Sequence, residues 1–215
     1  MEQERMEVFL EKYRRQSAPY IADLERQALA ADVPIIRRGT RDLLRYLLRT
    51  GKPARVLEIG TAIGYSALFM KSCLPETSSI TTIEKVEMRL TEARQNIARY
   101  DKAGQITLLE GDAADILQRL AEAGEQYDFI FMDAAKGQYL NFLPFVCRLL
   151  AQGGTLVSDN ILHEGDVLES RYAVTRRDRT IHGRMRQYLQ ALTERKELET
   201  ICLAVGDGMT ISYRQ

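Results

Sequence analysis

Several acidic side chains stand where a short apolar run of the sequence ends, a placement that suits ligand binding. They are Glu84, Asp112, Asp133 and Asp159. Taken alone, such an acid is usually solvated or caps the following helix. When successive runs are parallel strands, however, their carboxyl ends meet at one edge of a sheet, which is where α/β proteins bind ligands. The recurrence of acids at these positions therefore predicts one shared cleft.

The segment "VLEIGTAIGYSA" (56–67) predicts a tight turn between a buried strand and a helix. Gly60 and Gly64 allow the backbone to approach a ligand closely, and a helix that starts near Tyr65 offers free N–H groups. The spacing differs from the G-x-G-x-x-G fingerprint of dinucleotide sites. Glu58 would repel a pyrophosphate but attract the amine and sulfonium of S-adenosylmethionine. The turn therefore favours S-adenosylmethionine over NAD.

The next two strands would supply the other contacts of a nucleoside. Glu84 follows Gly60 by 24 residues. This is close to the spacing at which such folds place a ribose-binding carboxylate. Asp112 could accept a hydrogen bond from the adenine amino group, and the backbone N–H of Ala113 could donate one to a ring nitrogen. Each acid by itself could equally be a solvated strand end or a helix cap. Their common register favours the nucleoside site.

The fourth and fifth apolar runs end in oxygen ligands that suit a metal ion. Asp133, Asp159 and Asn160 would lie on adjacent loops. Two carboxylates and an amide suit Mg²⁺ or another hard divalent cation, whereas Zn²⁺ is disfavoured because no cysteine or histidine joins them. Each residue alone could be a helix cap or a turn residue. Crowded carboxylates need a cation to neutralise them, so the set predicts a metal site.

Lys136 lies three residues after Asp133 and could project into the same cleft. There it could take a proton from a substrate hydroxyl as a general base. The alternative is an ordinary solvated surface lysine. The neighbouring acids favour the catalytic interpretation, in which Asp133 also takes part.

The elements that position these residues form an alternating pattern. Short apolar runs separated by helix-compatible stretches predict a parallel sheet with helices on both faces. The runs occupy residues 54–60, 79–84, 105–113, 127–135 and 154–160. Two further runs, 199–205 and 209–214, flank "GDG" and predict an antiparallel hairpin at the edge. The expected fold is a Rossmann-like, doubly wound α/β sheet of seven strands.

Residues 1–52 predict a helical cap ahead of this core. Helical spacing over residues 1–31 is interrupted at Pro19, and a further helix is expected to begin with Thr40 as its N-cap and to end before Gly51. Residues 53–215 would then be the core of a single domain, 1–215.

Composition limits the class of protein. The 30 basic and 30 acidic side chains cancel, so no long-range field indicates a general binder of nucleic acid or membranes. Cys73, Cys147 and Cys202 lack metal-ligand spacing and are expected to be reduced core residues. Without a secretory-type apolar segment or a membrane-spanning run, the chain is expected to be cytoplasmic. His163 and His182 accompany no nucleophile motif of a hydrolase, and surface or structural roles are expected for them.

Taken together, the motifs resemble those of the metal-dependent O-methyltransferases related to catechol and caffeoyl-CoA O-methyltransferases. The resemblance covers nearly the whole chain and rests on "VLEIGTAIGYSA", "TTIEK", "EGDA", "FMDAAKGQY" and "SDN". It implies S-adenosylmethionine and a divalent metal as cofactors. It also implies roles for named residues: Glu58, Gly60 and Ser66 at the methionine end, Glu84 at the ribose, Asp112 and Ala113 at the adenine, Asp133 at both metal and cofactor, and Ile36 of "VPII" at the cofactor.

Within that family the chain is most similar to a bacterial branch that includes tRNA 5-hydroxyuridine methyltransferases. The resemblance implies methylation of the 5-hydroxyl at the wobble position of a tRNA anticodon loop, and a homodimer. Because the 5-hydroxyl and the 4-carbonyl oxygen are neighbours, they could chelate a metal as the two oxygens of a catechol do. A small phenolic acceptor is therefore the alternative, although the chain contains no tryptophan. A noncatalytic nucleoside-binding or RNA-binding module is a third possibility on this fold.

Two arginine-rich segments are candidate RNA contacts. One includes Arg37 and Arg38, and the other, after the metal motif, includes Arg176 and Arg177. Such residues could hold phosphates, with the base of an unpaired nucleotide inserted into the cleft. Arginines spaced in this way often form only a solvated face. Tyr139 and Tyr172 are candidate stacking residues, although ordinary packing is favoured for both.

Overall fold

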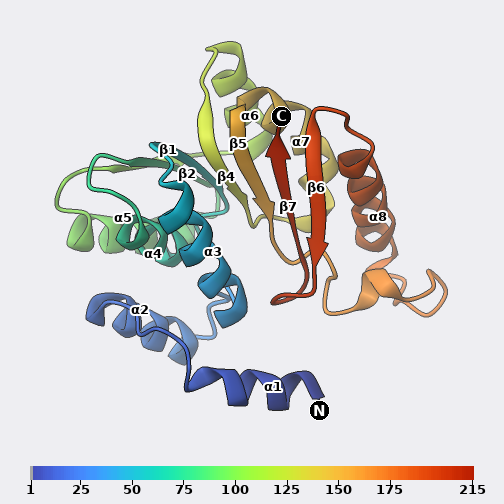
Figure 1. The fold of residues 1–215 in the computed structure, drawn as a ribbon, viewed down its shortest axis with the longest axis horizontal. Coiled ribbons are helices and arrows are strands. Elements are labelled where there is room, and N and C mark those ends of the chain that lie inside the picture. The colour runs from blue at the N-terminus through green and yellow to red at the C-terminus, as the bar shows by residue number, and fades with distance from the viewer. Residues whose placement is uncertain (1) are drawn as a thin grey trace.

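The computed structural model describes residues 2–215, which are built around one seven-stranded sheet (Figure 1). The strands are β1 (Arg55–Ile59), β2 (Ser79–Glu84), β3 (Ile106–Glu110), β4 (Tyr127–Met132), β5 (Leu150–Ser158), β6 (Leu198–Leu203) and β7 (Met209–Arg214). Their order is β3-β2-β1-β4-β5-β7-β6. Strands β1 to β5 pair in parallel, whereas β7 pairs antiparallel with both β5 and β6. The predicted doubly wound sheet with a C-terminal hairpin is confirmed.

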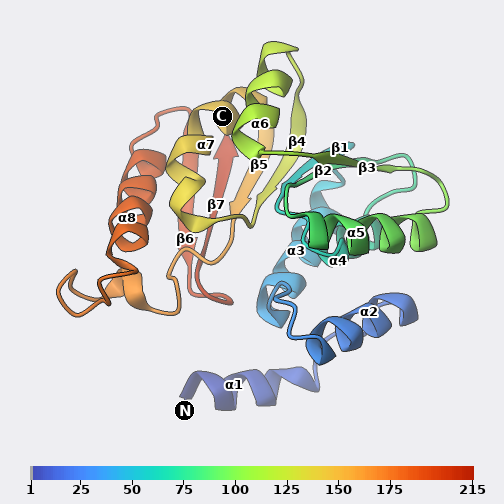
Figure 2. The ribbon, with the colours of Figure 1, turned by 180° about the vertical axis from the view of Figure 1, so that it is seen from behind.

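Helices cover both faces of the sheet (Figures 1 and 2). They are α1 (Glu2–Glu11), α2 (Pro19–Ala30), α3 (Arg38–Gly51), α4 (Tyr65–Cys73), α5 (Glu87–Tyr100), α6 (Ala113–Glu122), α7 (Tyr139–Leu149) and α8 (Arg179–Thr193). Helices α2 to α5 lie on one face, and α6 to α8 lie on the other. Short 3₁₀ turns occupy Lys136–Gln138 (η1) and Asp166–Leu168 (η2). None of the helices in residues 2–215 is long and apolar enough to cross a membrane.

The two faces of the sheet bury two apolar clusters, which explains the continuous hydrophobic runs of the central strands. Along β1, Val56 packs with the α2–α4 side, while Leu57 and Ile59 pack with the α6–α8 side. Side chains alternate between faces along a strand, so a strand that is covered on both faces is apolar at nearly every position. Glu58 is the exception in this strand, and it lies on the same face as Val56.

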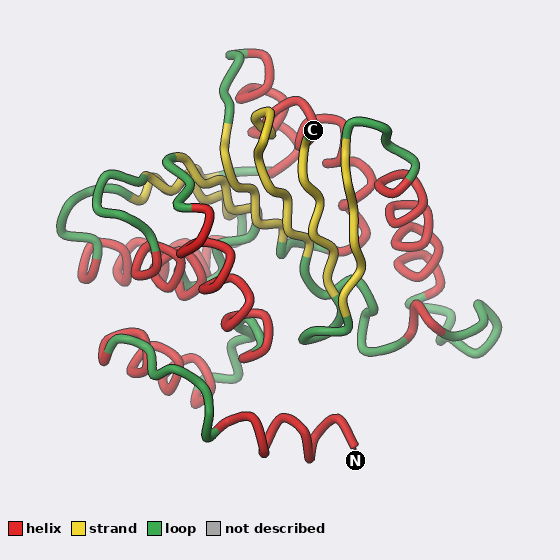
Figure 3. Tube along the Cα trace, in the orientation of Figure 1, coloured by secondary structure: helices red, strands yellow, loops and turns green. Residues whose placement is uncertain are grey.

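The N-terminal cap is more extended than the rest of the chain. Figure 3 shows α1 and α2 below the sheet, joined to the core through α3. Helix α2 begins at Pro19, in agreement with the predicted break. Helix α3 begins at Arg38, two residues before the predicted N-cap, and Gly51 is its last residue. The N-cap prediction for Thr40 is wrong because this side chain is buried inside α3 and faces the sheet, where it donates to Asp159.

The cysteines differ in burial. Cys73 and Cys147 are buried, as predicted. The prediction of a core position is wrong for Cys202, which lies exposed on the edge strand β6. An edge strand of an antiparallel hairpin can face solvent on one side, so an apolar-looking run does not ensure burial there.

Candidate active site

The turn after β1 fits directly against the end of β4. Gly60 has φ +108°, and a Cβ placed on it would lie 2.0 Å from the carbonyl oxygen of Asp133. The backbone N–H groups of Gly60 and Thr61 both donate to the carbonyl of Ile83 at 3.1 Å. Helix α4 then begins at Tyr65, where the sequence predicts it. Glycine at position 60 therefore lets the ends of β1, β2 and β4 meet without a gap.

Glu58 lies behind this turn rather than in the open cleft. Its side chain is fully buried, and one carboxylate oxygen accepts a hydrogen bond from the Thr82 hydroxyl at 2.5 Å. Burial raises the pKa of Glu58 to about 7, against the opposing effect of the Ser66 and Thr82 hydroxyls. Glu58 therefore contacts β2 through Thr82 and does not line the cavity.

A cavity of about 550 Å³ runs across the carboxyl ends of β1 to β4. The reversal of strand order between β1 and β4 opens this edge of the sheet, as expected for a doubly wound fold. The cavity brings together nine of the residues predicted to bind the cofactor or metal or to take part in catalysis: Ile36, Gly60, Ser66, Glu84, Asp112, Ala113, Asp133, Lys136 and Asn160. Glu58 and Asp159 are fully buried just outside its lining.

One end of the cavity has the features of a nucleoside site. The carboxylate of Glu84 accepts hydrogen bonds from three backbone N–H groups, those of Ala62, Lys85 and Val86, at 2.8–2.9 Å. These contacts fix its orientation at the end of β2. Asp112 caps α6 by accepting from the Ala114 N–H at 2.9 Å, so the helix-cap alternative holds for it as well. That hydrogen bond, together with Lys85, lowers the pKa of Asp112.

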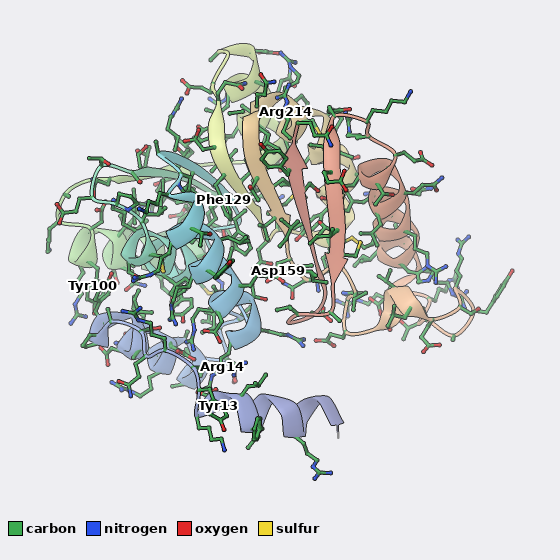
Figure 4. All side chains as sticks on the ribbon, in the orientation of Figure 1. Tyr13, Arg14, Tyr100, Phe129, Asp159 and Arg214 are labelled. Carbon is green, nitrogen blue, oxygen red and sulfur yellow. The ribbon has the colours of Figure 1, made fainter. Side chains whose placement is uncertain are left out.

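The other end of the cavity holds the acids of β4 and β5. The Asn160 amide donates to Oδ1 of Asp133 at 2.8 Å, and the Asn160 backbone N–H donates to Oδ1 of Asp159 at 2.9 Å. The Thr40 hydroxyl donates to the same Asp159 oxygen at 3.2 Å, so α3 also contacts the cluster. Figure 4 places Asp159 between α3 and the strands β5 and β7. The three predicted ligands are thus adjacent.

The charges of this cluster are poorly compensated by the protein itself. Oδ2 of Asp159 is buried and has no hydrogen-bond partner among the described residues. Burial, reinforced by Asp133, raises the pKa of Asp159 to about 7. Burial also raises the pKa of Asp133, although Asn160 and Lys136 act in the opposite direction.

A divalent cation fits this donor set. An unpartnered buried carboxylate oxygen, a second carboxylate and an amide oxygen are hard ligands of the kind that Mg²⁺ prefers. Within the described part of the chain, no group of three or more His, Cys, Asp and Glu side chains is arranged to hold a metal. A cation here would therefore rely on two carboxylates, Asn160 and further ligands such as water or substrate.

Lys136 extends to the same end of the cavity from the 3₁₀ turn η1. Its Nζ lies 3.3 Å from Nδ1 of His163 and 3.7 Å from Oδ2 of Asp207. The lysine side chain is 22% exposed, which differs from the fully solvated alternative. His163 thus contacts Lys136 without lining the cavity, whereas His182 is buried at the start of α8 and contacts the Glu169 carbonyl.

Sequence reasoning misses three residues that support the cluster: Thr40, Tyr139 and Asp207. The Tyr139 hydroxyl lies 3.1 Å from the Met132 carbonyl and 3.0 Å from the Asp159 carbonyl, so it joins the ends of β4 and β5. Tyr139 is fully buried, so the ordinary packing favoured for it is confirmed and it cannot stack on a base. Tyr172 is 89% exposed. The only sequence signals for the supporting residues are Tyr139 within "DAAKGQY" and Asp207 within "GDG".

The arginine-rich segments divide into structural and free side chains. Arg38 forms ion pairs with Glu11 and Glu25, which leaves it little freedom to hold RNA. Arg37 lines the cavity. By contrast, three exposed arginines between β5 and α8 form no hydrogen bond or ion pair through their side chains within the described part of the chain: Arg171, Arg176 and Arg177.

Comparison with known proteins places these features in a family. The sequence profile of the O-methyltransferase family matches residues 13–215. A caffeoyl-CoA O-methyltransferase from Eucalyptus globulus is 32% identical over 174 residues, which cover 80% of this chain and 71% of that protein. A catechol O-methyltransferase from Niastella koreensis is 34% identical over 127 residues. That alignment covers 59% of this chain and spans only 58% of the curated relative's length.

Solved structures share the whole fold. The crystal structure of a candidate caffeoyl-CoA O-methyltransferase from Staphylococcus aureus superposes with a TM-score of 0.87 at 31% identity, covering 100% of both chains. An O-methyltransferase from Bacillus cereus, solved in complex with SAH, superposes with a TM-score of 0.85 at 22% identity, covering 98% of this chain and 97% of the other, and shows the same fold. The match to the family profile over nearly the whole chain and the shared architecture establish that this chain belongs to the O-methyltransferase family.

Proposed function

We propose that the chain transfers a methyl group from S-adenosylmethionine to a hydroxyl of a small phenolic acceptor that carries a second oxygen beside the first. The observation that carries this proposal is the single cavity with two chemically different ends. A nucleoside-type end at Glu84 lies opposite an end that contains Asp133, Asn160 and Lys136. Membership in the O-methyltransferase family supports the reaction type.

The cofactor end is formed by residues that orient rather than react. S-adenosylmethionine supplies an electrophilic methyl group on a positively charged sulfur. Glu84, which lines this end, would accept hydrogen bonds from the two ribose hydroxyls, and Ala113 would contact the adenine from the start of α6. Gly60 and Ser66 would border the methionine portion, and Ile36, in the segment before α3, would cover it. Such contacts would orient the cofactor within the cavity.

The acceptor end provides charge compensation and a base. Asp133, Asp159 and Asn160 would hold Mg²⁺ or another divalent cation, which supplies Lewis acidity and lowers the pKa of an acceptor hydroxyl. Lys136 Nζ takes the hydroxyl proton. Partial burial of Lys136 limits competition from bulk water for that proton.

The donor set and the relatives support the proposed acceptor class. Two adjacent oxygens on an acceptor match a cation that keeps open positions beside two carboxylates and an amide. The matched relatives include proteins that are named as catechol and caffeoyl-CoA O-methyltransferases. Small phenols are therefore the favoured acceptors over a nucleic acid.

The test is a methyl-transfer assay with labelled S-adenosylmethionine and a panel of catechols, mono-phenols and hydroxylated tRNA. We expect catechols to accept label and mono-phenols to accept little. Asp159→Ala should abolish transfer while S-adenosylmethionine binding, measured by calorimetry, persists. Equal labelling of catechols and mono-phenols, or full activity of Asp159→Ala, would refute the proposal.

A tRNA 5-hydroxyuridine acceptor is the second candidate, and one observation favours it. Arg171, Arg176 and Arg177 extend from the segment before α8 as exposed cations without partners in the described chain. They could bind phosphates that flank an unpaired nucleotide. In this case hydroxylated tRNA should accept label, and replacing Arg176 and Arg177 with alanine should reduce the salt dependence of RNA binding without changing turnover of catechol. The homodimer and the cytoplasmic location remain predictions.

A further inference from the structure

A lysine that acts as a base needs an environment that fixes its amine. The Lys136 side chain is long and flexible and begins in a three-residue 3₁₀ turn. Neither feature by itself determines where Nζ lies. Two neighbours do so in the structure: Asp207 Oδ2 at 3.7 Å and His163 Nδ1 at 3.3 Å. Both lie outside η1.

Asp207 is held rigidly in the turn between β6 and β7. It is only 6% exposed, and both of its carboxylate oxygens lie 2.9 Å from the backbone N–H of Glu164. The carbonyls of Asp207 and Gly208 accept hydrogen bonds from the Leu162 and Ile161 N–H groups at 3.0 Å. The hairpin turn is thus joined to the segment that follows the proposed metal ligands.

That segment has an unfavourable backbone conformation. His163 and Glu164 have φ values of +51° and +58°, in the left-handed region that side-chain-bearing residues seldom occupy. Each residue in this conformation costs on the order of 1 kcal/mol of stability, and the conformation persists only when the surrounding structure imposes it. The hydrogen bonds from Glu164 to Asp207 impose it here. They also place His163 beside Lys136.

We propose that Asp207 is a positioning residue for Lys136. Its carboxylate lies 3.7 Å from the lysine amine at the acceptor end of the cavity, and it holds the His163 turn that contacts the amine from another side. Its negative charge also stabilises the ammonium that forms when the amine takes the acceptor proton. This inference rests on the proposed function, in which Lys136 is the base.

The charge changes in the reaction explain why a carboxylate suits this position. The acceptor O–H bond breaks as a new N–H bond forms on Lys136. The electron pair left on the oxygen forms the bond to the methyl carbon, and the carbon–sulfur pair leaves with sulfur, which becomes a neutral thioether. Lys136 is therefore the group that gains positive charge. Asp207 lies near enough to Lys136 to stabilise that charge.

A double-mutant cycle tests the proposal with full-length protein, labelled S-adenosylmethionine and catechol. Asp207→Asn can still accept the Glu164 N–H but carries no charge. We expect it to lower kcat by about 10–100-fold, as for other residues that orient a catalytic group, with the KM for S-adenosylmethionine and the melting temperature nearly unchanged. Asp207→Glu, which keeps the charge, should recover part of the loss.

The Lys136→Ala background separates positioning from a purely structural role. If Asp207 acts through Lys136, Asp207→Asn should cause no further loss in Lys136→Ala. A loss of the same factor in both backgrounds would overturn the proposal, because it would show that Asp207 only maintains the fold. Asp207→Ser is the second variant for the same cycle if Asp207→Asn does not fold, since a hydroxyl also accepts the Glu164 N–H.

The controls distinguish this inference from the proposed function. Asp178 faces His163 from the other side, with its Oδ1 3.9 Å from Nε2. Asp178→Asn removes a nearby charge that does not contact Lys136, and its kcat should stay within about two-fold of the wild type, since a partly exposed pair at 3.9 Å contributes little. Wild-type activity of Lys136→Ala would refute the proposed base. A slow Lys136→Ala combined with a fully active Asp207→Asn would refute only the role of Asp207.

Discussion

Gly60 is the residue at which the site tolerates least change. Its φ is positive, and a Cβ at this position would lie only 2.0 Å from the Asp133 carbonyl oxygen, which leaves no room for a side chain. We predict that Gly60→Ala destabilises the protein by about 3 kcal/mol, through backbone strain and overpacking together. Urea unfolding measures the loss, and calorimetry should show weakened S-adenosylmethionine binding.

Gly104→Ala is the matched control for this change. Gly104 has a positive φ of +65°, but nothing lies within 4 Å of its Cβ position. Gly104→Ala should therefore lower the free energy of unfolding by only about 1 kcal/mol, the effect of the backbone conformation alone. Equal losses for the two variants would show that contact with the end of β4 is unimportant.

Glu58 makes stability depend on pH. Its folded pKa of about 7 lies above its ordinary value of 4.5, so the folded protein binds more protons than the unfolded chain between these values. Stability must then fall as pH rises through that window, by up to about 1.4 kcal/mol per pH unit. Glu58→Gln removes this contribution, whereas Asp159 contributes alike in both proteins.

The measurement is urea unfolding in metal-free buffer at several pH values from about 5 to about 7, the window between the two pKa values of Glu58. We expect the stability of the wild type to decrease more steeply with pH than that of Glu58→Gln. Parallel slopes in the two proteins would contradict the raised pKa of Glu58.

Among the elements, α7 has an unexpected part in the site through its first residue, Tyr139. The hydroxyl of Tyr139 joins the ends of β4 and β5, which carry the two acids. We predict that Tyr139→Phe lowers the free energy of unfolding by about 1–2 kcal/mol, the usual effect of an unsatisfied buried carbonyl, here that of Asp159, because the Met132 carbonyl still accepts the Asp159 N–H. It should also reduce the rate of methyl transfer and the affinity for Mg²⁺, because the spacing of Asp133 and Asp159 loosens.

Tyr188→Phe is a suitable control for Tyr139→Phe. Tyr188 is equally buried, packs edge-on against Tyr139 and bonds through its hydroxyl to Ser158 at 2.6 Å. Loss of the Tyr188 hydroxyl should reduce stability by a similar amount but leave Mg²⁺ affinity closer to that of the wild type. If both variants lose metal affinity equally, the role assigned to Tyr139 is wrong.

The elements themselves were predictable from sequence because their signals are local. Period and apolar content identify β1 to β5, and "GDG" identifies the turn of the β6–β7 hairpin. Parallel topology alone predicts that the acids at the strand ends lie at one edge of the sheet. Thr40 was not predictable as a partner of Asp159, since 119 positions separate them and only the packing of α3 on the sheet brings them together. Asp207 was likewise not predictable as a neighbour of Lys136.

At the scale of the whole molecule, two layers of helices and one sheet leave a single edge where the chemistry gathers. The strand-order reversal opens this edge, and loops from β1 to β5 together with the β6–β7 turn surround it. The family assignment and the proposed reaction agree with this arrangement. The identity of the acceptor does not follow from the fold, because the same sheet edge can present different loops to different substrates.

The central claim is that methyl transfer requires a divalent cation held by Asp133, Asp159 and Asn160. The most direct measurement is the initial rate of label transfer to catechol before chelation, after removal of metal with EDTA, and after addition of excess Mg²⁺. We predict that the rate falls to background in EDTA and returns with Mg²⁺ in the wild type. An undiminished rate in EDTA, with the residual metal content well below the protein concentration, would contradict the account.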